Sequence, residues 1–527
     1  MMFRQRHLNA AQGTPMKTIL LTMGAVAALT LMPASSALAQ DTKPLVIGTD
    51  VDAGTLDPRL TTDTTAYRVT DLIYAGLVHL TPNLQPVPDL AESWSSPDPT
   101  TIIFKLRPNL KFSDGSPLTA DDVVFTYQTL VDPNTHAPQR ALYAPIKSVE
   151  AVDPTTVKFT LSAPYAPLLS YMDIGIVSKK LVQGGADISL HPVGAGPMKL
   201  VSWTRGSDIV LTANDGYWKG APKIHDVDVK VIGDGSARAQ AFEAGDLDII
   251  QSPLAPDDIK RLAGDSRFGN VIMAGLGVNY INFNTKDPLL ADPKMRQAFS
   301  MLIDQKTIVS DIYQGVDQPA TSILLPSSWA YTPDIKQPAF DVDGAKKLFA
   351  EEGWKDSNGD GILDKDGKKL SVVLSTHSED ANRVQSIEFM QATFQSAGVD
   401  ATTHISDWPS FSTNYVMKGK HQIALLGWLN IVDPDRLMYA QLSTGGSTNW
   451  NGYSNPEVDK LLQQGRSSLD QKTRADAYQK AAAILAKDLP WYILSDQGYQ
   501  LFYKKDLPVT IQATPRGNFR GFIGLND

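Results

Sequence analysis

An oxygen-rich string, DSNGDGILDKDG at 356–367, has side chains that a calcium ion could use. Its oxygen groups stand at positions 1, 3, 5 and 9 of an EF-hand-like loop: Asp356, Asn358, Asp360 and Asp364. Gly361 occupies position 6, where that loop turns sharply, but position 12 is Gly367 instead of a bidentate glutamate. Two interpretations therefore stay open, a structural calcium site of reduced affinity and a solvated turn. No cofactor beyond calcium is expected.

Motifs for catalysis are missing from the sequence. HExxH, GxSxG and P-loop patterns do not occur, and the eight histidines are scattered. The glycine-rich turn GAGPMKL at 194–200 fails the GxGxxG spacing of a dinucleotide site. The absence of cysteine excludes a thiol nucleophile, a thiolate metal site and disulfides. We therefore expect a binding protein and no enzyme.

The N-terminus has the layout of a secretory signal. Basic residues at 4, 6 and 17 precede an apolar run at 18–32, and the residues at 37–39 read Ala-Leu-Ala, a cleavage pattern. This run is shorter than the roughly 20 residues that span a bilayer. We expect residues 1–39 to be a cleaved signal, and the lack of cysteine excludes a lipoprotein anchor.

The charge balance bears on partners. Residues 1–39 carry three basic and no acidic side chains, so their removal takes the formal charge from −9 to −12. An acidic chain lacks the basic stripe that neutralises phosphates, so nucleic acid is not expected as a partner. The length of 527 residues indicates two or more domains.

Residues 91–127 contain several sequence patterns that predict secondary structure. Apolar residues alternate at 102, 104 and 106, which predicts a half-buried strand. Thr119 and Asp122 have the spacing of a capping box, so a helix is expected to begin near Ala120. A helix is also expected from Tyr67 towards Leu77. Further helices are predicted at 237–244, from 292 onward, and at 342–352, 382–397, 456–465 and 472–487.

These segments resemble a known family. AESW at 91–94 and FKLRPNLKFSDGSPLTADDVVF at 104–125 resemble the signature of the family 5 extracellular solute-binding proteins, the peptide, nickel and related receptors of ABC importers. The resemblance implies an α/β, two-lobed periplasmic binding protein fold, type II and cluster C-like. Lobe I would comprise 40–80, 191–275 and 491–527, with a subdomain at 81–190, and lobe II would comprise 276–490.

The resemblance also implies a function. The protein would be a periplasmic, monomeric receptor that captures a solute between its lobes and delivers it to the ABC permease in the membrane. In peptide-binding members, the strand that ends in Gly-Trp lines the cleft and pairs with the ligand's main chain. The matching positions and their neighbours here are Thr64, Trp408, Gly427, Trp428, Leu429 and Asn430.

The sequence departs from the peptide-binding pattern at charged positions. Many peptide receptors have an aspartate three residues after this tryptophan, whereas this chain has Ile431 or, with a shorter loop, Asn430. Leu425 stands where an oligopeptide receptor has an arginine. Asp433 or Arg383 could substitute. A short peptide and a non-peptide solute such as an opine or saccharide therefore both stay open, with a metal chelate or haem less favoured.

Overall fold

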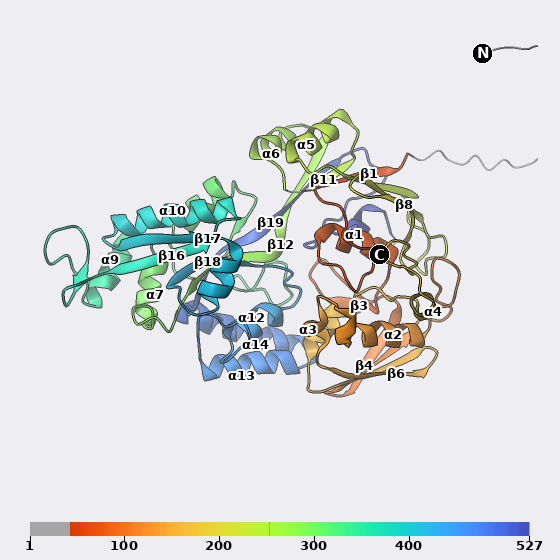
Figure 1. The fold of residues 1–527 in the computed structure, drawn as a ribbon, viewed down its shortest axis with the longest axis horizontal. Helices are drawn as coiled ribbons and strands as arrows, with labels where there is room; N and C mark the ends of the chain where they lie inside the picture. The colour runs from red at the N-terminus through yellow and green to blue at the C-terminus, as the bar shows by residue number, and fades with distance from the viewer. Residues whose placement is uncertain (1–42, 252, 526–527) are drawn as a thin grey trace, which may run out of the picture. The chain divides into compact units, whose positions relative to one another are not determined.

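The computed structural model describes residues 43–251 and 253–525, so the predicted signal at 1–39 lies outside the described residues. The described residues form an 11-stranded sheet in the order β17-β16-β18-β12-β19-β11-β1-β10-β9-β8, with β13 (Gln318–Pro319) paired to β19. Helices flank it, and the described residues also form a four-stranded sheet, which lies beside α2 in Figure 1, and two two-stranded sheets. Mixed parallel and antiparallel strands with helices confirm the α/β class and the two-lobed type II fold.

Two long strands connect the lobes. Strand β12 (Phe268–Phe283) runs antiparallel to β19 (Trp491–Lys504), and both pass from one group of elements to the other in Figure 1. Their pairing is interrupted between Ala274 and Val278. On one side of the interruption β19 also pairs with β11 (Ile249–Gln251), and on the other side β12 pairs with β18 (Ile423–Trp428).

The interruption locates the crossing between the lobes. Residues 491–496 of β19 pair with the part of β12 that also pairs with β18, so they belong to the second lobe's sheet. This pairing favours a second crossing at 496–498, whereas the resemblance implied a boundary between residues 490 and 491. The domain boundaries stay predictions.

Lobe I is built around the parallel pair of β1 and β10. Its strands and helices have these bounds: β1 (Leu45–Thr49), β8 (Met198–Thr204), β9 (Asp208–Ala213), β10 (Asp226–Val231), α1 (Thr64–Ile73), α5 (Gly235–Ala244) and α6 (Pro256–Ala263). Helix α1 ends at Ile73, so the expected extension to Leu77 is wrong. The backbone is already extended at Tyr74, and the N–H of Tyr74 donates the last hydrogen bond of the helix to the Thr70 carbonyl.

The segment at 81–190 contains its own sheet and core. Its sheet has the order β4-β5-β7-β6, and helix α2 (Ala120–Val131) covers it with Val123 and Tyr127 buried. The predicted capping box is confirmed, because Thr119 N–H donates to Asp122 Oδ2 over 2.9 Å and Thr119 also accepts from the N3 backbone. The strands are β4 (Ala91–Asp98), β5 (Thr101–Leu106), β6 (Ile146–Asp153) and β7 (Thr156–Leu161).

Lobe II holds two apolar cores, one on each face of its part of the sheet. Its helices confirm the predicted periodicities: α7 (Pro293–Ser300), α9 (Val342–Glu351), α10 (Ala381–Ser396), α13 (Pro456–Ser467) and α14 (Gln471–Asp488). Helix α12 (Pro434–Leu442) follows β18, and the parallel strands β16 (Ser371–His377) and β17 (Asp400–Ser406) complete the sheet.

Candidate functional site

A cavity of about 460 Å³ lies where the two connecting strands are interrupted. Its walls come from both lobes and from the 81–190 segment, a size and position typical of a small-molecule site. The contributing segments are 58–62, α1, 74–79, Asp89, 139–143, 171–175, 275–277, 429–436, 497–499 and 515–520.

Glycines open the sheet at this point. Three residues, 275–277, stand in β12 opposite Gln497, so the ladder is broken there. A Cβ on Gly498 would clash with the backbone carbonyl of Val316, so this position requires glycine. A Cβ on Gly277 would instead meet the flexible ends of the Gln497 and Leu429 side chains, which would have to shift.

Asp71 is the least satisfied carboxylate in the wall. It lies in the last turn of α1, and its Oδ2 is buried and accepts no hydrogen bond from any described residue. Burial raises the pKa of Asp71, and the positive charges of Arg520, His79 and Arg516 oppose that rise. Tyr67, one turn earlier on the same face of α1, also lines the cavity.

Two arginines of the wall have no carboxylate partner among the described residues. Arg68 is 8% exposed and stands over the rings of Tyr499 and Phe519, each at 5.8 Å. Arg436 comes from helix α12, and its Nε is buried without a hydrogen bond from the described part of the chain. Burial raises the pKa of Tyr67, and Arg516 and Arg436 oppose this by charge, which places Arg436 near α1.

The other charged groups of the wall are paired. Arg516 binds Asp173, and Arg520 lies 3.3 Å from Asp89, which also accepts a 3.1 Å hydrogen bond from Trp218. With four arginines against three aspartates, the lining carries one excess positive charge when His79 is neutral. Three buried tyrosine hydroxyls of the wall make no hydrogen bond within the described residues: Tyr74, Tyr171 and Tyr499. The cavity is thus suited to a ligand with charges of both signs.

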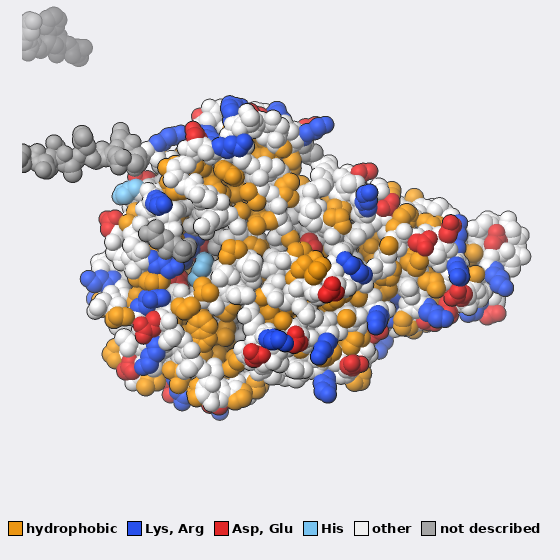
Figure 2. Space-filling model, turned by 180° about the vertical axis from the view of Figure 1, so that it is seen from behind, with side chains coloured by type: hydrophobic (Ala, Val, Ile, Leu, Met, Phe, Trp, Pro, Cys, Tyr) orange, Lys and Arg blue, Asp and Glu red, His pale blue; other side chains and the backbone are white. Residues whose placement is uncertain are grey.

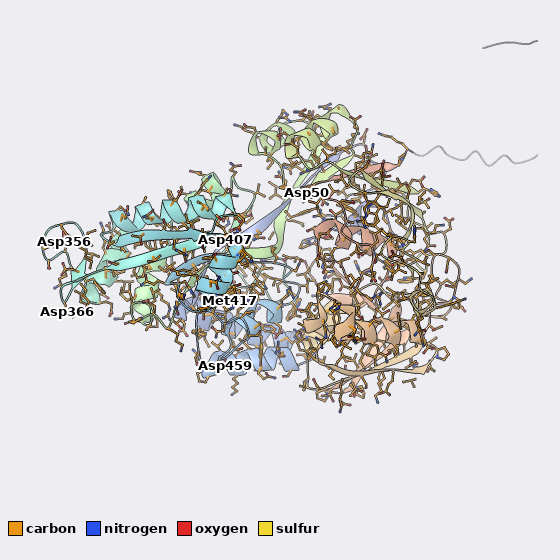
Figure 3. The ribbon with its side chains drawn as sticks, in the orientation of Figure 1. Asp50, Asp356, Asp366, Asp407, Met417 and Asp459 are labelled. Atoms are coloured by element: carbon orange, nitrogen blue, oxygen red, sulfur yellow. The ribbon has the colours of Figure 1, made fainter. Side chains whose placement is uncertain are left out.

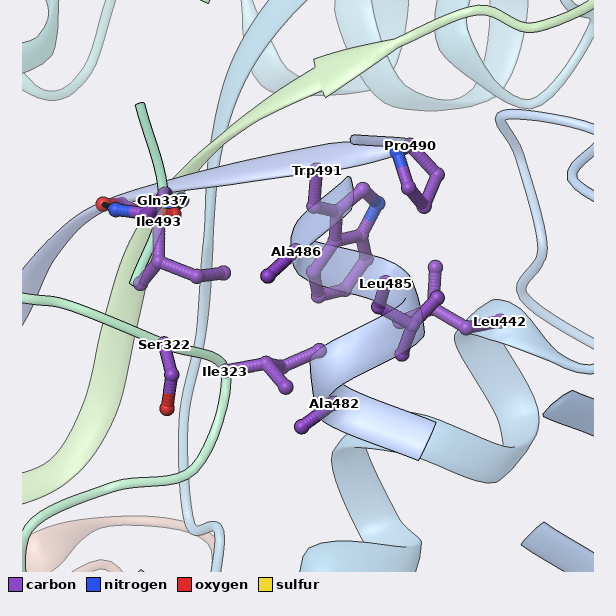
Figure 4. Close-up of a pocket in the computed structure, with 10 residues that line it drawn as sticks. All are labelled: Ser322, Ile323, Gln337, Leu442, Ala482, Leu485, Ala486, Pro490, Trp491 and Ile493. Carbon is purple, nitrogen blue, oxygen red and sulfur yellow. Dashed lines mark hydrogen bonds between the residues drawn. The ribbon is translucent and has the colours of Figure 1, made fainter. Parts of the chain in front are cut away.

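A second cavity, of about 20 Å³, lies between β19 and α14 (Figure 4). Apart from Ser322 and Gln337 its labelled walls are apolar, and they include Trp491 and Leu485. Its volume holds about one water molecule. It is therefore too small for a solute.

The oxygen-rich loop at 356–367 lies at the outer end of lobe II, as the labels of Asp356 and Asp366 show in Figure 3, and it contributes no residue to the described cavity lining. Asp356 accepts hydrogen bonds from the N–H groups of Gly359 and Gly361 at 2.7 and 3.0 Å. Asp360 Oδ2 is 3.4 Å from Lys369 Nζ. Within the described residues no three His, Asp or Glu side chains gather closely enough to hold a metal ion. Calcium binding through Asp356, Asn358, Asp360 and Asp364 stays a prediction.

Comparison with known proteins identifies the chain. A sequence profile of the bacterial extracellular solute-binding proteins, family 5 (middle), matches residues 85–449. The chain belongs to this family.

Individual family 5 relatives match most of the chain. The oligopeptide-binding protein AppA of Bacillus subtilis (strain 168) is 30% identical over 491 residues, 88% of this chain and 90% of AppA. A structure of AppA from Bacillus subtilis with a nonapeptide covers 91% of this chain and 98% of that one, with a TM-score of 0.69 and 28% identity. Heme-binding protein A of Haemophilus influenzae is 28% identical, over 79% of this chain and 83% of its own.

A third relative is known with a metal complex. The structure of NikZ from Campylobacter jejuni with Ni(L-His) is 26% identical, covers 90% of this chain and 97% of that one, and has a TM-score of 0.71. These relatives are binding proteins by name or by their bound ligand, which agrees with the expectation of a binding protein.

Of the six ligand contacts that the family 5 resemblance implies, the structure places three in the wall of the cavity. Thr64, Leu429 and Asn430 line the cavity, and Asn430 has a left-handed backbone (φ 57°). Gly427 and Trp428 precede them in β18 but are not among the lining residues that the structure describes.

The remaining predicted contacts have other neighbours. Gly427 pairs with Asn279 and lies under Arg383, since a Cβ there would be 2.0 Å from Arg383 Nη2. Trp428 packs on Trp450 with ring centroids 6.4 Å apart. Trp408 is 43% exposed and packs on the ring of His377. Direct ligand contact by these three residues stays a prediction.

Neither suggested substitute for the missing charge lines the described cavity. Asp433 is buried in an ion pair with Arg474, whose Nη2 donates to its carboxylate oxygens at 2.8 and 2.9 Å. Arg383 donates to Asn279 Oδ1 at 3.1 and 2.9 Å. Ile431 is buried and donates its N–H to the Leu276 carbonyl.

Sequence reasoning missed the charged groups that do line the cavity. Arg68 and Asp71 stand three residues apart on α1, a spacing that by itself indicates a local surface pair. They form no ion pair with each other, and both line the cavity. The only sequence signal available was therefore this spacing on one face of a helix.

Proposed function

We propose that this protein is the periplasmic ligand-binding component of an ABC importer that captures a short peptide or peptide-like solute between its lobes. The carrying observation is the cavity of about 460 Å³ at the interruption of β12 and β19, with charged groups of both signs in its walls. Its relatives include an oligopeptide-binding protein that is 30% identical over 88% of this chain.

The connecting strands supply a mechanism for capture. In the described residues the main sheet passes between the lobes through short crossings at 275–277 and 496–498, where the ladder is already broken. Bending at these points separates the walls of the cavity, whereas a ligand that contacts both walls favours the closed form by its difference in affinity. The closed form then presents the surface that the permease recognises.

The cavity offers main-chain and side-chain groups to a peptide. Leu429 and Asn430 continue from β18, and 275–277 leave the strand ladder, so both can pair with an extended ligand. Asp71 and the arginines suit the ligand's ammonium and carboxylate groups.

An opine is the second candidate ligand. Such molecules carry several carboxylates around one amine, and the excess of arginines over aspartates in the lining favours this pattern. A saccharide, a metal chelate or haem fits these charged walls less well, because each needs neutral platforms or a dedicated metal ligand set.

The proposal includes location and assembly. A cleaved signal at 1–39 directs export, and the mature chain acts as a monomer with the permease as its partner and without turning over its ligand. Among the described residues no helix is both long and apolar enough to cross a membrane. On the face drawn in Figure 2, basic and acidic side chains are interspersed, which does not favour nucleic acid.

Mass spectrometry of the native protein tests the proposal. The protein is purified from its host without added ligand, denatured, and the released small molecules are identified. A peptide or an opine is expected in roughly stoichiometric amount. Release of a sugar, haem or metal chelate in that amount would contradict the proposed ligand class.

A further inference from the structure

The charges of the cavity are divided between the lobes. The second lobe and its connecting strand contribute Leu276, Gly277, Leu429, Asn430, Val432 and Arg436 to the described lining. Arg436 is the charged member of this set, and the set contains no Asp or Glu. The family's peptide clamp uses a carboxylate from this side, so that mode of holding an ammonium is absent from the described wall.

The first lobe provides a carboxylate in its place. Asp71 projects from α1 into the cavity, and its buried Oδ2 accepts no hydrogen bond from the described chain. A buried carboxylate oxygen without a partner destabilises the empty protein, because its lost hydration is not replaced. A ligand ammonium, which brings three donors and a charge, removes this cost.

Arg436 is the matching cation across the cavity. It makes no ion pair and stands over no aromatic ring within the described residues, and its Nε is buried without a partner. Arg68 also has a buried Nε without a partner, but it stands on α1 with Asp71 and against the rings of Tyr499 and Phe519. Arg516 binds Asp173. Arg436 is therefore the guanidinium of the second lobe with free capacity for a carboxylate, and its bidentate fork suits one.

We propose that the ligand is a zwitterion held across the lobes, with its α-ammonium on Asp71 of the first lobe and its α-carboxylate on Arg436 of the second. This inference rests on the proposed capture of a peptide and specifies how its ends are recognised. Since each end binds a different lobe, only a molecule that carries both charges joins the walls. Charge recognition and closure are thus the same event.

Peptides with modified ends provide the test. A tryptic digest of casein is passed over the immobilised protein, and one retained peptide is synthesised with free ends, with an acetylated N-terminus and with an amidated C-terminus. Calorimetry measures each against the wild type, Asp71→Asn and Arg436→Gln. Asp121→Asn and Arg261→Gln, on the surface away from the cavity, are the matched controls.

The expected result is a specific loss of discrimination. Either modification weakens binding to the wild type and controls at least tenfold. Asp71→Asn binds the free and acetylated peptides within twofold of each other, and Arg436→Gln does the same for the free and amidated peptides. A merely structural role would lower all affinities alike and leave both ratios unchanged.

Two other results would overturn the inference. If Asp71→Asn still discriminates tenfold against the acetylated peptide, the ammonium binds elsewhere, while peptide capture itself stands. If the wild type retains no peptide from the digest, the proposed peptide ligand and this inference both fail.

Discussion

Ser170 donates a buried hydrogen bond of 3.1 Å to Asp433, and so joins the segment inserted in the first lobe to the second lobe. Asp433 is at the same time held by Arg474 through two bonds. Nearby, Val432 and Leu276 pack into the apolar core of the inserted segment. The contact between the lobes therefore extends beyond the cavity wall and stabilises the form in which the cavity is enclosed.

Ser170→Ala is expected to weaken ligand binding about fivefold. One hydrogen bond contributes about 1 kcal/mol, and this one exists only when the lobes are closed. Calorimetry with a peptide retained from the casein digest measures the change. Ser162→Ala, which removes an exposed hydroxyl bonded to the Pro145 carbonyl, is the control and should bind like the wild type. Equal affinity in both variants would show that the contact does not favour closure.

Asp496 makes the stability of the empty protein depend on pH. Burial, with the charge of Asp317, raises the pKa of Asp496 to about 8, and its Oδ1 has no hydrogen bond among the described residues. The folded protein thus holds a proton that the unfolded chain releases near pH 4. The contribution of this protonated carboxyl to the free energy of unfolding is fully present below about pH 4 and is lost as the pH rises towards about 8.

Asp496→Asn should remove this dependence. Relative to the variant, the wild type is expected to lose about 1.4 kcal/mol of unfolding free energy per pH unit between about pH 5 and pH 7. Urea unfolding at three pH values measures it. Asp506→Asn, at an exposed position, should run parallel to the wild type. Parallel curves for all three proteins would contradict the buried, protonated state of Asp496.

Asn430→Ala is expected to weaken binding of the retained peptide by about 1–3 kcal/mol, the cost of leaving a buried polar partner unsatisfied. Asn430 lines the cavity in a left-handed conformation, so some stability is also lost on substitution. Asn109 is exposed and has nearly the same φ, 58°, so Asn109→Ala reproduces that backbone cost without touching the cavity. Matching affinities in the two variants would remove Asn430 from the site.

Calcium binding to the loop at 356–367 is tested by calorimetry on the mature protein. If the loop binds calcium, heat is released in the wild type and abolished in Asp360→Ala, because the carboxylate of Asp360 is lost. Asp366→Ala, in the same loop but outside the predicted ligand set, should keep the signal. A flat titration of the wild type would leave the solvated turn as the correct interpretation.

Local signals predicted most of the fold but little of the charged site. The capping box of Thr119 and Asp122 and the periodicity of α10 depend on neighbours in sequence, and both are confirmed. Asp71 meets Arg516 and Arg520 only after the C-terminal segment returns to the cavity. Asp433, which the sequence suggested as a ligand contact, is buried in an ion pair with Arg474, 41 residues away in the chain. Such partners follow from packing and not from local pattern.

Small-angle X-ray scattering with and without the retained peptide tests the central claim most directly. Closure around a ligand between the lobes should lower the radius of gyration of the wild type at saturation. Asp121→Asn should show the same decrease, and Arg436→Gln a smaller one, since the second lobe then lacks its charged contact. A peptide that saturates the wild type, as calorimetry shows, and leaves an initially open protein unchanged in radius would contradict capture between the lobes.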